Sequence, residues 1–251
     1  NSSDVVYAEP DYTINATYVP NDPRINTNGQ LNANAWYLDR VYADNAWDIN
    51  QGGSSAVAIA VLDTGVDYNH EDLAANIWSN LDELTNGVDD DNNGFIDDNR
   101  GWNFVSNNNN PNDDNNHGTH VAGIAAAVGD NAVGVAGLSY NSKIMPVKVL
   151  TSSGSGSYTA EVSGIRYSTD NGADVITMSF GGYGYSQTLL EATEYANNLG
   201  ALQIAAACND WTSNTCYPAG YPAVMAVAAT DETARKAWFS NYGTWVDISA
   251  P

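Results

Sequence analysis

Three polar residues of this 251-residue chain stand where they could move protons during catalysis. Asp63 ends the apolar run AVAIAVL, His117 opens HGTHVAG, and Asn209 follows ALQIAAAC. A histidine acts as a general base when its pKa lies near neutral and a carboxylate holds its other ring nitrogen in one tautomer. Asp63 can supply that carboxylate, and the Asn209 amide can donate a hydrogen bond to a developing oxyanion. The set indicates acid–base catalysis centred on His117.

Two other interpretations of the HGTH stretch explain less. His117 and His120 are three residues apart with no glutamate between them. Zinc proteases place a glutamate inside a histidine pair at a spacing of four, so a zinc site is disfavoured. A histidine that only caps a helix would explain neither Asp63 nor Asn209.

The elements that must position these residues alternate between strands and helices. Small-residue and amphipathic patterns predict helices over 117–129, 158–172 and 186–200, while apolar runs predict strands over 56–65, 143–150, 173–180, 201–208 and 223–230. Residues 1 to about 50 and 80–116 are expected to be irregular. The alternation predicts one α/β domain with a mostly parallel central sheet covered by helices on both faces. Asp63, Ser179 and Asn209 then meet His117 at the carboxyl edge of the sheet.

Composition narrows the class of protein. Eight Lys plus Arg against 30 Asp plus Glu give a formal net charge of −22, which argues against nucleic acid or an anionic membrane as partner. No apolar run reaches the roughly 18 residues of a membrane span. The first residues, NSSDVVYAEP, lack the pattern of a secretory signal, which is expected to lie outside this chain if it exists.

Five blocks, in this order, resemble the signature blocks of the subtilisin-like serine proteases, also called subtilases or the S8 peptidases, and of their thermitase-like branch in particular. The blocks are VLDTGVDYNHEDL, NNHGTHVAGIAAA, VITMSFGG, AAACND and FSNYGTWVDISAP. The resemblance runs from about residue 18 to Pro251 and implies a three-layer subtilisin-like fold. It also implies that Asp63 orients His117, that His117 is general base and then general acid, that Asn209 is the oxyanion donor and that His120 is structural.

The resemblance further implies two strand edges that clamp an extended polypeptide substrate through backbone hydrogen bonds. Gly154, Ser155 and Gly156 would line one edge, and Ser179, Phe180 and Gly181 the other. Such a grip is expected of an endopeptidase with broad sequence tolerance.

Calcium is the cofactor that two segments favour. The loop DDDNNGFIDD, residues 89–98, resembles the first half of an EF-hand loop, but its twelfth position is Arg100 instead of glutamate. Its predicted ligands are Asp89, Asp91, Asn93, Phe95 and either Asp98 or Asp97, and a solvated acidic loop is the alternative. The family resemblance implies a second site with side-chain ligands Asp22, Asp72 and Asn131 and carbonyl ligands Val128, Val133 and Val135.

Cys208 and Cys216 are too few for a cysteine zinc site. Eight residues apart, they are compatible with a small disulfide, which would suit a secreted protein, or with two free thiols. The resemblance implies that a bridge here would brace the first specificity pocket.

The N-terminal segment and the missing serine block complete the prediction. Residues 1–17, which contain VVYAEPDYT, resemble a propeptide tail or form a simple extension, and 18–251 would be the peptidase domain. The family serine belongs to a Gly-Thr-Ser-Met-Ala block that is absent from the chain. The predicted function is a secreted, monomeric serine endopeptidase, inhibited by its own propeptide, whose nucleophile lies beyond Pro251. The 251 residues alone are expected to be inactive. The alternative is a non-catalytic, calcium-stabilised peptide-binding module on a protease fold.

Overall fold

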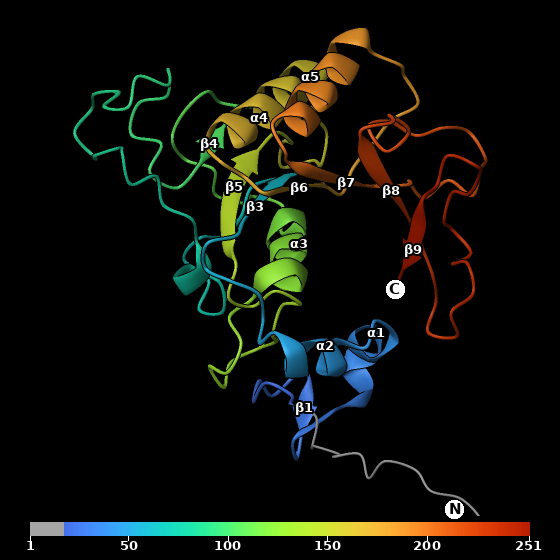
Figure 1. Cartoon of the computed structure of the whole chain (residues 1–251). Helices are drawn as coiled ribbons and strands as arrows, with labels where there is room; N and C mark the ends of the chain where they lie inside the picture. Colours follow the sequence, from blue (N-terminus) through green and yellow to red (C-terminus); the bar gives the residue numbers. More distant parts are fainter. Residues whose placement is uncertain (1–17) are drawn as a thin grey trace, which may run out of the picture.

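A seven-stranded parallel sheet forms the centre of the computed structural model, which describes residues 18–251 (Figure 1). Its strand order is β4-β5-β3-β6-β7-β8-β9, and every neighbouring pair is parallel. The strands are β3 (Ala58–Asp63), β4 (Trp102–Asn103), β5 (Lys143–Lys148), β6 (Val175–Met178), β7 (Leu202–Ala206), β8 (Val224–Ala229) and β9 (Ile248–Ala250). The predicted parallel sheet is confirmed, and β4 and β9 extend it at its two edges.

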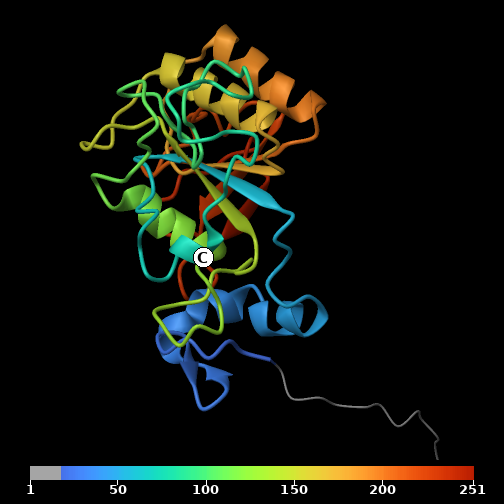
Figure 2. The ribbon, with the colours of Figure 1, turned by 90° about the vertical axis from the view of Figure 1, so that its left-hand side faces the viewer.

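Helices cover both faces of this sheet, as the sequence predicts (Figure 1, Figure 2). Helices α4 (Tyr158–Asp170) and α5 (Gln187–Asn198) pack together on one face, and α3 (His117–Ala126) lies on the other. β3 is buried at all six positions because it sits between β5 and β6. Two core clusters, one on each face, use its alternating side chains: Ala60 and Leu62 on one, Ile59 and Val61 on the other.

The prediction of an irregular N-terminal region is wrong for part of its length. Two short strands, β1 (Asn26–Thr27) and β2 (Gln30–Leu31), pair antiparallel, and α1 (Trp36–Arg40) and α2 (Ala43–Ile49) follow. The many Asn and Asp residues favour turns locally, but burial of Leu38 and Trp47 in a separate small core stabilises the helices. Tertiary packing therefore overrides local preference here.

Residues 80–116 are mainly turn and bend, as predicted, apart from the two residues of β4. Among the described residues, no helix is both long and apolar enough to cross a membrane. The predicted propeptide tail, residues 1–17, lies outside the described part of the chain.

Candidate active site

Asp63 and His117 meet at the carboxyl edge of the sheet. Asp63 is the last residue of β3 and His117 the first residue of α3. Nδ1 of the imidazole lies 2.7 Å from Oδ1 of Asp63. The Asp63 side chain is fully buried, whereas 49% of the His117 side chain is exposed. The carboxylate therefore fixes one nitrogen of the ring, and the ring itself faces solvent.

The surroundings of Asp63 set its ionisation. Burial raises the pKa of this carboxyl, opposed by the hydrogen bonds from His117 and from the Thr64 backbone N–H. The second oxygen, Oδ2, is buried with no hydrogen-bond partner among the described residues. A positive charge near this carboxylate would compensate for its missing solvation.

Asp113, which the sequence analysis did not single out, organises the start of α3. Its two oxygens accept hydrogen bonds from the Thr64 hydroxyl at 2.8 Å and the Thr119 hydroxyl at 2.6 Å, and from the backbone N–H groups of Asn115, Asn116 and Thr119. Burial acts to raise the pKa of Asp113, but these hydrogen bonds outweigh it and lower the pKa. In the sequence, the signal for this role is that Asp113 lies four residues before the predicted helix start at His117.

Close approach of backbone also fixes His117. Gly118 follows it on α3, and a side chain there would collide with the Gly65 carbonyl oxygen and come within 2.9 Å of the Asp63 Cβ. Its N–H donates to the Thr64 hydroxyl at 3.0 Å. Glycine at this position lets the helix pack directly against the end of β3.

Lys148 is a second residue that the sequence analysis missed. It ends β5 and is only 3% exposed. Its Nζ donates to the Thr64 carbonyl at 2.5 Å, to the Leu150 carbonyl at 2.9 Å and to Asp114 at 2.6 Å. A lysine in the otherwise apolar run IMPVKVL was the available signal. The buried cation ties the ends of two neighbouring strands together beside Asp63.

Asn209 and Ser179 share one hollow. Both line a cavity of about 650 Å³ whose other walls are mainly apolar residues of α3 and of the sheet, together with Ala250 and Pro251. Asn209 is exposed, three residues beyond the end of β7. Within residues 18–251 its side chain has no hydrogen bond to His117. His120, the predicted structural residue, is exposed and lines a different hollow between α1 and α3.

The two predicted substrate edges lie on opposite sides of one pocket of about 340 Å³. Gly154, Ser155 and Gly156 line one side, and Phe180 and Gly181 the other. Leu150 and Gly156 form an antiparallel bridge on the first side, and Gly182 pairs with Tyr217 on the second, with backbone distances of 2.8 and 2.7 Å. Ser179 is the one predicted edge residue outside this pocket, since it lines the Asn209 hollow.

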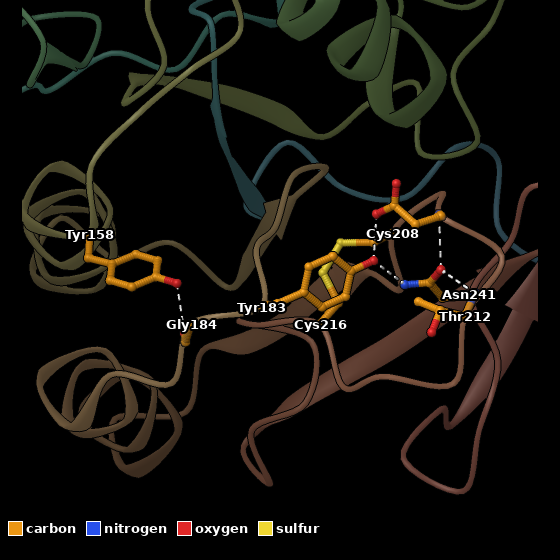
Figure 3. Close-up of a disulfide and its surroundings, with 8 residues drawn as sticks. Tyr158, Tyr183, Gly184, Cys208, Thr212, Cys216 and Asn241 are labelled. Atoms are coloured by element: carbon orange, nitrogen blue, oxygen red, sulfur yellow. Dashed lines mark hydrogen bonds between the residues drawn. A yellow bond between two sulfur atoms is a disulfide. The ribbon is translucent and has the colours of Figure 1, made fainter.

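The second edge rests on a disulfide. Cys208 and Cys216 are bonded, with Cα atoms 6.3 Å apart, so of the two alternatives the bridge is confirmed (Figure 3). A Cβ on Gly181 would lie 2.6 Å from the Cys216 sulfur and 2.8 Å from the Cys208 sulfur. The disulfide therefore packs directly behind Gly181.

Tyrosine hydroxyls hold the chain around this bridge. Tyr158 donates to the Gly184 carbonyl at 2.7 Å, and Tyr183 accepts from the Asn241 amide at 3.0 Å (Figure 3). The Asn241 side chain, fully buried, also accepts from the Thr212 N–H at 3.1 Å. These contacts fix the loops on both sides of the second edge.

The side chains of the family-type calcium site gather in one place. Asp22 is fully buried and Asp72 is 3% exposed. The Asn131 amide donates to Asp72 at 2.8 Å, and the Val135 N–H donates to the same carboxylate at 2.9 Å. Oδ1 of Asp22 is buried without a partner among the described residues. Burial raises the pKa of Asp22, and the nearby charge of Asp72 adds to that effect. A cation bound between these carboxylates would relieve both costs, so the residues present fit calcium.

The residues predicted as carbonyl ligands of that site belong to the loop that contacts Asp72. The Val128 N–H donates to the Asp72 backbone carbonyl at 2.9 Å, and the Val133 N–H donates to the Asn131 side-chain oxygen at 2.7 Å. These contacts place the 128–135 loop against Asp72.

The acidic loop around residues 89–98 has a different centre from the one predicted. Ligand atoms of Glu83, Asp89 and Asp91 lie within 4.8 Å of one another. Glu83 is 3% exposed and accepts from the N–H groups of Asp90 and Asp97 at 3.0 and 2.8 Å. Glu83 was missed because it lies outside the EF-hand-like spacing, although it precedes Asp89 by only six residues.

The other predicted ligands of this loop are already engaged. Asn93 donates from its amide to Asp91 at 3.0 Å and to Asp98 at 3.2 Å. Asp98 is fully buried and also accepts from the Tyr167 hydroxyl at 2.6 Å. Burial raises the pKa of Asp98. The Phe95 ring packs against aromatic side chains, so only its backbone carbonyl could serve as a ligand.

Comparisons with known proteins establish the family of this chain. Residues 54–251 match the model of the subtilase family. A thermophilic serine proteinase of Bacillus sp. strain AK1 is 42% identical over 251 residues, which is all of this chain and 56% of that protein. Thermitase of Thermoactinomyces vulgaris is 40% identical, covering 93% of this chain and 74% of thermitase. A halolysin-like extracellular serine protease of Natrialba magadii is 38% identical, covering 99% of this chain and 42% of that protein. The chain thus spans about half the length of two of these three relatives, and it belongs to the subtilase family.

Proposed function

We propose that this chain forms the Asp–His–Asn part of a secreted serine endopeptidase. The observation that carries the proposal is the 2.7 Å contact between His117 Nδ1 and the buried Asp63 carboxylate, on a ring that remains half exposed. This contact leaves Nε2 as the nitrogen that can take a proton from a nucleophile. Two of the relatives, those of Bacillus sp. strain AK1 and Natrialba magadii, are named as serine proteases, which supports the same reaction.

The roles of the residues follow from ordinary acyl-transfer chemistry. His117 Nε2 takes the proton of a serine hydroxyl as the hydroxyl attacks the scissile carbonyl carbon, and then gives that proton to the leaving amine. Asp63 keeps the ring in the required tautomer and stabilises the imidazolium. The Asn209 amide donates to the carbonyl oxygen as it becomes negative, and losing such a donor costs about 100- to 1000-fold in rate.

The serine is proposed to come from a segment that follows Pro251. Ser179 and Ser240 belong to other family blocks, and Ser157 lies in a substrate-edge loop. No serine hydroxyl in residues 18–251 is hydrogen-bonded to His117. Pro251 lines the same 650 Å³ hollow as Asn209. A continuation of the chain from that point would start beside the proposed oxyanion donor.

An extended polypeptide is the proposed substrate. The bridge-forming segments at Gly156 and Gly182 leave a pocket between them, and a peptide can pair with such segments by strand addition. We further propose that calcium held by Asp22 and Asp72, with carbonyls of the 128–135 loop, stabilises the fold. When bound, the ion supplies positive charge for two buried carboxylates. The disulfide and the relative named as extracellular support action outside the cell.

Labelling with a fluorophosphonate probe tests the proposal. The 251-residue chain should take no label and hydrolyse no chromogenic peptide, because the nucleophile is outside it. The same chain with its natural C-terminal continuation should be labelled and active, and His117→Ala in that protein should abolish both signals. Label on the 251-residue chain would contradict the placement of the serine. If the extended chain takes no label and hydrolyses no peptide but still binds peptides, a non-catalytic peptide-binding module would be favoured.

A further inference from the structure

One buried acid at the proposed substrate pocket takes no part in the mechanism described above. Glu161 lies in the first turn of α4 and is only 5% exposed. Its Oε1 is fully covered and has no hydrogen-bond partner among the described residues. A buried carboxyl without a partner costs free energy, because nothing replaces the water that it loses.

Glu161 also borders a cavity. It lines the pocket of about 340 Å³ between the two substrate edges, together with Leu150, Gly156, Phe180 and Tyr217. A cationic group that enters this pocket from solvent can approach the Glu161 carboxyl. The apolar neighbours would grip the stem of a side chain, and Glu161 would meet its end.

No cation within residues 18–251 forms an ion pair with Glu161. The residues that line the pocket include neither lysine nor arginine, and the two ion pairs among residues 18–251 are His117–Asp63 and Lys148–Asp114. Arg166, on the same helix, stacks over the Tyr195 ring at 4.8 Å.

The other titratable groups near the pocket are the tyrosines Tyr158, Tyr217 and Tyr221, whose side chains carry no positive charge in either protonation state. Tyr158 and Tyr221 donate their hydroxyl hydrogens to the backbone carbonyls of Gly184 and Ser186. The protein therefore leaves the Glu161 carboxyl without an internal counter-charge.

We propose that Glu161 determines specificity by binding the cationic side chain of a substrate lysine or arginine in this pocket. The inference rests on the proposed peptidase function. A long aliphatic stem ending in a cation fits the apolar walls and the acid at the base, whereas an apolar side chain would leave the carboxyl unpartnered.

The proposal has a distinctive pH dependence. Burial raises the pKa of Glu161 to about 8, so the free carboxyl is mostly neutral below that pH. Binding a cation favours the ionised form and so releases a proton, which makes the affinity rise with pH until the free carboxyl is ionised. Lysine and arginine stay protonated throughout this range. An apolar side chain gains nothing from ionisation of Glu161.

Peptide cleavage by the chain with its C-terminal continuation tests this. Chromogenic peptides would carry arginine or norleucine at each of the positions preceding the scissile bond, one position at a time. At one position, the ratio of kcat/KM for the arginine peptide to kcat/KM for the norleucine peptide should rise by up to about tenfold per pH unit. The total rise should be on the order of 100-fold between pH 6 and pH 9, and the ratio should level off above pH 9. The ratio cancels the pH dependence of His117, since both peptides use the same histidine.

Two variants separate specificity from structure. Glu161→Gln keeps the shape and should remove the arginine preference and its pH dependence while cleavage of the norleucine peptide persists. Glu194→Gln, at an exposed acid of α5, should behave as the parent protein. An arginine preference that survives in E161Q, or the absence of any preference at pH 9, would overturn the proposal.

Binding distinguishes failure of this proposal from failure of the peptidase function. If the extended chain cleaves none of the peptides, the proposed function is wrong. Fluorescence anisotropy with the same labelled peptides still measures whether arginine binds more tightly than norleucine through Glu161. Equal affinity of the two peptides at pH 9 would then overturn the specificity role as well.

Discussion

Two regions of the molecule are built around buried aspartates, and they differ in what faces the acid. At the carboxyl edge of the sheet, Asp63 faces His117 at 2.7 Å, and Lys148 pairs with Asp114 nearby at 2.6 Å. At the proposed calcium site, Asp22 faces Asp72, and no ion pair within residues 18–251 involves either. Both Asp22 and Asp63 are fully buried, so both lose their hydration.

The difference shows where the chain supplies its own positive charge. It has eight Lys plus Arg for 30 Asp plus Glu, and two of its three histidines lie on α3. At the proposed catalytic edge the chain supplies Lys148, which pairs with Asp114, and His117, which contacts Asp63 and becomes a cation when it takes up a proton. The proposed calcium site has only neutral N–H donors, so its balance must come from an added cation.

The largest effect is expected from breaking the Asp63–His117 pair. In the chain extended by its natural continuation, Asp63→Asn should lower kcat by a factor on the order of 10⁴, because an amide no longer favours the required tautomer or the imidazolium. His117→Ala should lower it at least as far. These sizes are those measured on related triads, including that of subtilisin, and are not deduced from this geometry. Steady-state kinetics on a chromogenic peptide would measure both.

Asp39→Asn is a suitable control for the aspartate variant, since Asp39 is exposed on α1. It should leave kcat unchanged. If Asp63→Asn kept more than about a tenth of the parent kcat, against the loss expected for a triad aspartate, the role of Asp63 would be wrong.

An intermediate effect is expected from calcium. At about 100 times its dissociation constant, a bound ion stabilises the native state by about 2.7 kcal/mol. Adding a chelator should lower the melting temperature accordingly. Asp22→Asn should remove this calcium response. In the absence of calcium the same substitution should be neutral or stabilising, because burial and Asp72 already disfavour the charged form of Asp22.

The pH dependence of the calcium effect follows from the raised pKa of Asp22. In calcium-free protein, the contribution of Asp22 to stability is complete below its ordinary pKa and is lost as the pH rises through the raised value. Calcium needs the ionised carboxylate, so its stabilising effect should grow with pH over the same window. Thermal unfolding at several pH values, with and without calcium, measures both trends. A calcium effect that shrinks with rising pH would contradict the site.

The sequence predicted the regular part of the fold because its signals are local. The apolar run that ends at Asp63 and the small-residue helix that begins at His117 each have one structural interpretation, and their order dictates a parallel sheet. Helices α1 and α2 escaped prediction because their stability comes from burying Leu38 and Trp47 against distant residues. Propensity does not contain that information.

The same division applies to the site. The Asp63–His117 contact could be predicted, since both residues end elements that converge at one edge. The functions suggested for Asp113, Glu83 and Glu161 could not, because each depends on which distant groups its carboxyl faces. In the sequence, for example, Glu161 is one of several polar residues of an amphipathic helix, and only the structure shows that it lines a pocket.

The smallest effect is expected from Glu83, whose loop combines features of both regions. Its carboxylate lies near Asp89 and Asp91, as at the proposed calcium site, yet it also accepts two backbone N–H groups at 2.8 and 3.0 Å. Glu83→Gln turns one acceptor oxygen into a donor and leaves a part-buried N–H of Asp90 or Asp97 unpaired. We expect the substitution to lower the local stability of this loop by about 1 to 2 kcal/mol. The loss should appear as faster amide hydrogen exchange over residues 83–98 and not elsewhere in the protein.

Calcium distinguishes the two features of this loop. If the Glu83 cluster binds the ion, calcium should slow amide exchange over 83–98 in the parent protein and have much less effect in E83Q. The matched control is Glu71→Gln, an exposed acid in the segment before Leu73. It should leave exchange in the loop unchanged. A loop that exchanges at the same rate with and without calcium is held by its own hydrogen bonds and, unlike the proposed calcium site at Asp22, needs no added cation.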